Sequence, residues 1–146
     1  MPELDFAFLA DHVRVEGGVA HVLAAGIDTI TAPTVPTGQN IGVHFRLGFT
    51  RQECGRPHRI EIIFQDEDGR RLLQLANVVT PEWTPTLPPH WRQGLAVGMN
   101  LGVPLPHYGL YSFELMVNDE ARATLPLRVI PQEQAPTAAR VADEPQ

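Results

Sequence analysis

The chain has 146 residues, which fits one domain with an ordinary hydrophobic core, and a formal net charge of −6. The 11 cationic residues are all arginine, and the acidic balance argues against binding to the phosphate backbone of nucleic acids. The single cysteine cannot form an internal disulfide, and the sequence shows neither a signal peptide nor a run of about 18 apolar residues. We therefore expect a cytoplasmic protein that contacts neither nucleic acid nor membrane.

The first strand is predicted close to the start of the chain, where apolar and polar residues alternate. Phe6 and Phe8 share one parity of this alternation. Val13 and Val15 share the other, so a bulge near Ala10–Asp11 is expected if both pairs point inward.

A hairpin is predicted next, because Gly17–Gly18 suits a two-residue turn with positive φ at both positions. The register of such a turn places Val15 opposite Ala20 and Val13 opposite Val22. Both pairs are apolar, so the predicted hairpin has one consistent apolar face.

Two central elements follow a crossover rich in threonine and proline at 31–38. Residues 41–49 alternate strictly and predict a strand. A second hairpin turns at residues 66–69, and a four-residue loop would set Ile62 opposite Leu73. We interpret the acidic residues of this loop as a structural turn ending in a glycine with positive φ, and not as a calcium loop.

The segment 80–92 is rich in proline and holds both tryptophans, so it predicts neither strand nor helix. Another strand is predicted over 95–103, and a third hairpin near the end pairs Phe113 with Leu125. Residues 132–146 consist largely of Pro, Gln, Ala and Glu and predict a disordered tail.

These elements predict one domain over residues 1–131, an antiparallel β-sandwich of about eight strands with immunoglobulin-like or related Greek-key topology. Tyr111 enters a late strand directly after a loop. This arrangement resembles the tyrosine corner of immunoglobulin-like sandwiches.

Three stretches, Phe8–His12, Phe64–Gly69 and Gly109–Leu115, resemble a family of small bacterial β-sandwich proteins of unknown function that is frequent in actinobacteria. The resemblance extends over nearly the whole chain up to Pro131. It implies a bacterial source and a single domain, and it brings no assigned activity or catalytic residue.

No catalytic or metal-binding set is predicted. His12 and His21 share the outward face of the first hairpin, but Arg14 lies beside them and no His-x-His or His-x-x-x-His spacing occurs. Cys54 and His58 are close in sequence, yet no third group is seen that would orient them for nucleophilic chemistry. We expect neither an enzyme nor a cofactor nor a metal.

The outer face of the strand at 94–102 is the main candidate site, because it carries almost no side chains and a neighbouring strand is similarly bare. Such a face is suited to being covered by the chain's own segment 80–92, or by a second subunit or another protein. The candidate interface residues are Gly94, Ala96, Gly98, Asn100, Gly102, His44 and Arg46.

The sequence therefore supports two functional hypotheses. The first is a non-enzymatic interaction or structural protein that assembles with itself, as a homodimer for example, or with another protein. The alternative is a protein that binds a sugar-like or aromatic ligand through an aromatic lip. The residues proposed for the lip are Trp83, His90, Trp91 and Tyr108.

Overall fold

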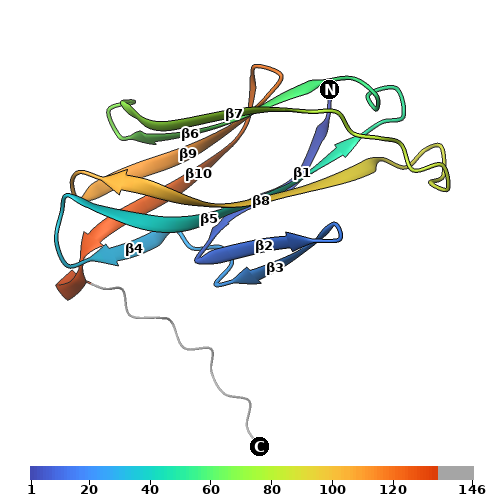
Figure 1. Cartoon of the computed structure of the whole chain (residues 1–146). Helices are drawn as coiled ribbons and strands as arrows, with labels where there is room; N and C mark the ends of the chain where they lie inside the picture. The colour runs from blue at the N-terminus through green and yellow to red at the C-terminus, as the bar shows by residue number, and fades with distance from the viewer. Residues whose placement is uncertain (135–146) are drawn as a thin grey trace, which may run out of the picture.

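The structure is a computed structural model, and it describes residues 1–134 (Figure 1). The described chain forms ten strands and one short 3-10 turn. These are β1 (Glu3–Ala10), β2 (His12–Glu16), β3 (Val19–Leu23), β4 (Thr29–Ala32), β5 (Thr37–Phe49), β6 (His58–Asp66), β7 (Arg71–Val79), β8 (Gln93–Leu105), β9 (Gly109–Val117), β10 (Glu120–Pro131) and η1 (Gln132–Gln134). The predicted tail begins in η1, and its residues from 135 onward lie outside the described part.

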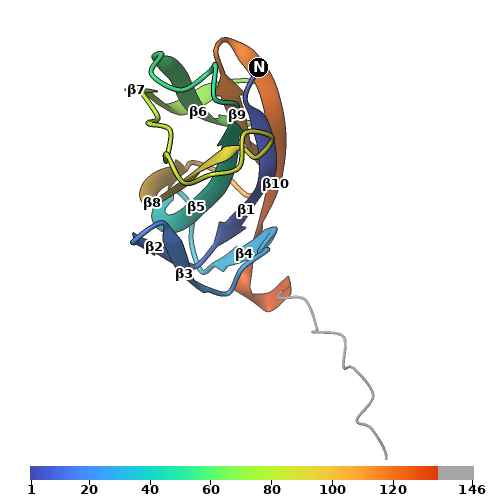
Figure 2. The same ribbon diagram turned by 90° about the vertical axis from the view of Figure 1, so that its right-hand side faces the viewer.

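The strands form three sheets, and the two larger ones pack face to face as predicted for a sandwich (Figures 1 and 2). One has the order β1-β5-β8 and the other the order β4-β10-β9-β6-β7. Hairpin β2–β3 is a third, two-stranded sheet that lies against the outer side of β5 and β8. All pairs are antiparallel except β4 with β10, which is parallel. Within residues 1–134 no helix is long and apolar enough to cross a lipid bilayer.

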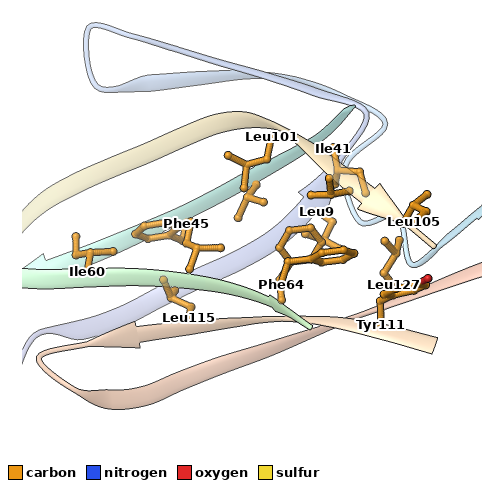
Figure 3. Packing of buried hydrophobic residues seen from close by; sticks show 14 of the residues in the cluster. Leu9, Ile41, Phe45, Ile60, Phe64, Leu101, Leu105, Tyr111, Leu115 and Leu127 are labelled. Carbon is orange, nitrogen blue, oxygen red and sulfur yellow. The ribbon is translucent and has the colours of Figure 1, made fainter. Parts of the chain in front are cut away.

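The core lies between the two larger sheets, where every second residue of each central strand is buried (Figure 3). Phe45 of β5 reaches into it from one side and Phe64 of β6 from the other. The ring of Phe64 stacks on Tyr111 with centroids 5.2 Å apart and tilts against Phe113 at 4.7 Å. The alternation in the sequence is therefore an inside–outside alternation, as period-two patterns predict.

The tyrosine corner is confirmed. The hydroxyl of Tyr111 donates to the carbonyl oxygen of His107 at 2.6 Å and accepts the His107 amide at 3.2 Å. This bond runs to the backbone four residues upstream, and it fixes the chain where it enters β9 from the preceding loop.

The first strand differs from the prediction. The predicted strand is interrupted at Asp11, so β1 belongs to the sandwich and β2 to the separate hairpin. The register of β1 against β5 shifts at Asp5. As a consequence Leu9 points into the core, and Phe6 and Phe8 lie on the outer face instead of inside.

The first and third hairpins have the predicted registers. Gly17 and Gly18 both have positive φ, 58° and 76°, and the strands pair as expected. Phe113 pairs with Leu125, although the turn is shorter than predicted. It is a two-residue turn at 118–119 followed by a bulge, which together give the register of a three-residue loop.

The predicted register of the second hairpin is wrong by two residues, because Ile62 pairs with Leu75. The carboxylate of Asp66 accepts the amides of Asp68 and Arg70 at 3.0 and 2.9 Å. This local bonding defines the turn, and a bulge shifts the first pairs of the ladder. The described residues form ten strands instead of about eight, because the first predicted strand is divided and β4 forms where no strand was predicted, at the start of the crossover.

Candidate functional site

The predicted interface residues do share one surface. In the β5–β8 ladder His44 lies opposite Gly98, and Arg46 lies opposite Ala96. Since residues on the opposite parity of both strands are in the core, this set forms the outer face of the three-stranded sheet.

The middle of this face is covered by the chain's own hairpin β2–β3, and not by segment 80–92 as expected. A Cβ atom on Gly98 would lie 2.6 Å from a methyl carbon of Val13 and 2.7 Å from one of Val15. One on Gly42 would lie 2.8 Å from the other methyl carbon of Val13. The glycines are therefore needed because the inner face of the hairpin lies directly on the sheet.

Asn100 fastens the hairpin to this face. Its side-chain oxygen accepts the backbone amide of Val13 at 2.9 Å, and its side-chain nitrogen donates to the Val13 carbonyl at 2.8 Å. One amide side chain thus pairs with both backbone polar groups of Val13. Asn100, one of the candidate interface residues, therefore binds β2 to β8 within the chain.

Two arginines cover the next part of the face. A Cβ on Gly94 would collide with the guanidinium of Arg46, which is paired with Asp5. Gly48 lies under the side chain of Arg92. Arg92 is the last residue of the predicted loop 80–92, and through its side chain this loop covers the sheet at Gly48.

The predicted aromatic lip is not assembled. Trp83, His90 and Trp91 lie in the loop that precedes β8, whereas Tyr108 follows the other end of this strand. Thirteen extended residues span about 40 Å. The Tyr108 hydroxyl donates to the carbonyl of Ala32, and the Trp91 side chain is 57% exposed.

Cys54 and His58 do not form a nucleophile–base pair. The Nε2 atom of His58 bonds to the carbonyl oxygen of Glu53 at 2.8 Å, and its Nδ1 lies 3.0 Å from the side-chain amide of Asn118. Burial and the neighbouring Glu53 carboxylate both raise the pKa of the Cys54 thiol. A raised pKa disfavours the thiolate that nucleophilic chemistry needs.

The hairpin histidines and the acidic turn likewise bring no metal ligands together. Arg14 pairs with His21 across the hairpin as predicted. Among residues 1–134, no group of three or more His, Cys, Asp or Glu side chains is placed to hold a metal ion.

A second surface, which we call the seam, lies where the edge strands β7 and β8 face each other on one side of the sandwich (Figure 2). It is a cleft of about 260 Å³ with apolar walls, and Leu75 on its rim is 39% exposed. The residues that line it include Ile60, Ile62, Leu75, Val79, Val97 and Met99.

The seam carries no charge. Residues 72–79 of β7 and all thirteen residues of β8 contain no Asp, Glu, Lys or Arg. The edge strands on the opposite side differ, because β1 contains Glu3 and Asp5 and β4 has only four residues. This contrast in charge was available from the sequence, but it has a meaning only once β7 and β8 are known to be neighbouring edges.

Comparison with known proteins identifies a family and two distant likenesses. A family model described as a family of unknown function (DUF6941) matches residues 5–130. No curated protein matches the chain.

Among solved structures, the chain is similar to the Pseudomonas fluorescens alkylpurine DNA glycosylase AlkC bound to DNA containing an abasic site analog. The identity is 10% and the TM-score 0.43, over 70% of this chain and 27% of that one. It is also similar to a glycosyl hydrolase family 2 member from Bacteroides cellulosilyticus DSM 14838, with 16% identity and a TM-score of 0.41, over 64% of this chain and 13% of that one. The chain spans less than a third of either protein, and no activity is transferred from them.

Proposed function

The chain belongs to this family of unknown function, DUF6941, and we propose that it is a protein-interaction module that binds an extended apolar segment at the seam. The observation that carries the proposal is the uncharged pair of long edge strands. Exposed edges invite pairing with another chain, and proteins that avoid this place charges, prolines or short strands there. The β1 and β4 side has such protection, whereas the seam has none along 72–79 and only Pro104 near the end of β8.

The chemistry of the seam defines the segment that it accepts. A strand added to the edge of β7 or β8 would gain backbone hydrogen bonds, and every second side chain would turn toward the apolar cleft. The segment should therefore alternate apolar residues and carry no charge on its inward face. A second copy of this chain satisfies the charge requirement in spite of its net charge of −6, because both seams are neutral.

The test places a lysine in the seam. Leu75→Lys puts a charge on the rim of the cleft, and Leu110→Lys is the matched control on an exposed leucine of β9, which is 53% accessible and does not line the seam. Light scattering after size-exclusion chromatography, over a range of protein concentrations, reports self-association. Cross-linking in an extract of the native host, with each variant as bait, reports other proteins.

The proposal predicts that wild-type protein and the Leu110 variant associate, with themselves or with one recurrent partner, and that Leu75→Lys does not. Circular dichroism spectra that agree between the variants ensure that both are folded. Association that is the same for Leu75→Lys and wild type would show that the seam is not the binding surface. A protein that stays monomeric and captures no partner would contradict the proposal as a whole.

A further inference from the structure

An aromatic hollow lies on the outer face of the three-stranded sheet, beside the part that the hairpin covers. It has a volume of about 370 Å³, which lies within the range of small-molecule sites. Its floor comes from β1 and β5, and the opposite wall from Ala20 and Val22 of β3. It shares no lining residue with the seam.

Three aromatic rings form the floor. The rings of Phe6 and Phe8 are nearly parallel, at 16°, with centroids 6.0 Å apart. His44 lies against both, with centroid distances of 5.4 and 5.3 Å. Since Phe6 is 42% exposed, its ring offers an accessible apolar surface on a sheet face where charged and polar side chains are usual.

The imidazole of His44 has a defined orientation and proton position. Its Nδ1 lies 2.8 Å from the carbonyl oxygen of Val97. A carbonyl oxygen can only accept, so Nδ1 carries a proton, and in this tautomer Nε2 is the acceptor.

The acceptor at Nε2 is free to bind a ligand. No described group bonds to it, although the residue as a whole is only 3% exposed. Within residues 1–134, no side-chain nitrogen or oxygen is fully buried without a hydrogen-bond partner. The Nε2 atom therefore keeps contact with solvent, and His44 is one of the residues that line the hollow.

The one arginine among the lining residues is already paired with a carboxylate. Arg46, at its margin, is engaged by the carboxylate of Asp5 through a short salt bridge between Nη1 and Oδ2. An anionic ligand would have to compete with this carboxylate, and a cation would meet the guanidinium first. A neutral ligand meets neither obstacle.

We propose that this hollow binds a neutral, flat aromatic molecule that carries an N–H or O–H donor, as indoles and phenols do. The ligand ring packs on the exposed ring of Phe6 and contacts Phe8, as aromatic pairs do at centroid distances of about 4.5–7 Å. Its donor bonds to Nε2 of His44. The proposal is independent of the seam and of any partner that binds there.

The experiment compares two probes that differ only in the donor. Indole carries an N–H, and 1-methylindole presents the same ring system without it. Each is titrated into uniformly ¹⁵N-labelled protein, up to about 5 mM, a range that detects dissociation constants near 1 mM. The amide signals of β1, β5 and β3 report the occupancy of the hollow, and those of β7 serve as an internal reference.

We expect saturable shifts with indole at the hollow and binding of 1-methylindole that is weaker by about 5- to 100-fold, since a buried acceptor would be left without its hydrogen bond. Phe6→Ala should weaken indole binding by at least about fivefold, because it removes the accessible ring surface. Leu110→Ala, on the five-stranded sheet, should bind indole as the wild type does.

Three results would overturn the proposal. One is the absence of saturable shifts at the hollow with indole. The second is equal affinity for indole and 1-methylindole, which would remove the role of His44. The third is an unchanged affinity in Phe6→Ala with an otherwise wild-type spectrum. A seam variant such as Leu75→Lys should bind indole normally, so failure here is distinct from failure of the proposed function.

Discussion

Replacing Gly98 by alanine tests whether hairpin β2–β3 is seated on the sheet as described. The new Cβ atom would lie 2.6 and 2.7 Å from methyl carbons of Val13 and Val15. Carbon atoms in good contact are about 3.5–4.0 Å apart, so the overlap is close to 1 Å on two sides. Val13 cannot retreat freely, because Asn100 holds both of its backbone polar groups.

The expected magnitude follows from two opposing effects. Overpacking of a well-packed contact typically costs about 1–3 kcal/mol. An alanine at an unstrained position gains about 0.4–1 kcal/mol, because it reduces the freedom of the unfolded chain. Since the overlap occurs on two sides, the overpacking cost should lie in the upper half of its range, and Gly98→Ala should lower the free energy of unfolding by about 1–2.5 kcal/mol.

Urea denaturation followed by circular dichroism measures this difference as a change in midpoint at constant slope. Gly102→Ala is the matched control, because a Cβ there would meet only the side-chain oxygen of Asn40, at an ordinary 3.5 Å. It should leave stability unchanged or raise it slightly. Both glycines lie on the same face of β8, so the comparison isolates the contact with the hairpin.

Removing the methyl groups of Val13 and Val15 should rescue Gly98→Ala. In a background with Val13→Ala and Val15→Ala, the added methyl group of Gly98→Ala has room, and its cost should fall by about 1 kcal/mol or more. If Gly98→Ala is as stable as wild type, or if its cost is the same in both backgrounds, the hairpin does not rest on Gly98 and the reasoning is refuted.

Four further outcomes are expected. Asn100→Ala should lower stability by about 1–3 kcal/mol and speed amide hydrogen exchange in the hairpin first, because two backbone groups lose their partner; uniform exchange would contradict this. The hydrogen bond from Arg59 holds the pKa of the Glu61 carboxyl below its usual 4.5, so the stabilisation that this carboxylate provides at neutral pH should be lost as the pH falls through the lowered pKa; the urea midpoints of Glu61→Gln and wild type should converge as the pH is lowered below 4.5, and a constant difference would contradict this. Tyr111→Phe should cost about 1 kcal/mol in the same assay, whereas no loss would mean that the corner bond is dispensable. Cys54 should be alkylated more slowly at neutral pH in the folded than in the urea-unfolded chain, since partial burial raises its thiol pKa, and equal rates would contradict the raised pKa.

Much of the sandwich could be predicted because its hairpins are specified locally. Gly17–Gly18 determines its register through a turn that only positive φ allows, and the alternation along β5 and β8 leaves one choice of buried face. The predicted register of the second hairpin was wrong because hydrogen bonds to the side chain of Asp66 define the turn, and residue spacing alone does not reveal such bonds. In β1 one parity is entirely apolar, with Leu4, Phe6 and Phe8, and this pattern did not reveal the register shift at Asp5 that turns Phe6 outward.

The candidate sites were less accessible to sequence reasoning, because they depend on contacts between distant residues. Asn100 bonds to a residue 87 positions away, and nothing near it in the sequence marks it as a fastening for the hairpin. The bare face of β8 suggested a cover from segment 80–92 or from another subunit, whereas Val13 and Val15 of hairpin β2–β3 lie against its middle. The seam required knowledge of which strands are edges.

The parallel pairing of β4 with β10 has a consequence for the order in which the chain can fold during synthesis. Residues 29–32 are made early, yet within residues 1–134 their only ladder partner is β10, at residues 128–131. The three-stranded sheet has all of its strands once residue 105 has left the ribosome. The five-stranded sheet has to wait for nearly the entire chain, and until then one face of the future core is exposed to the surrounding protein, which is when such chains are most prone to aggregate.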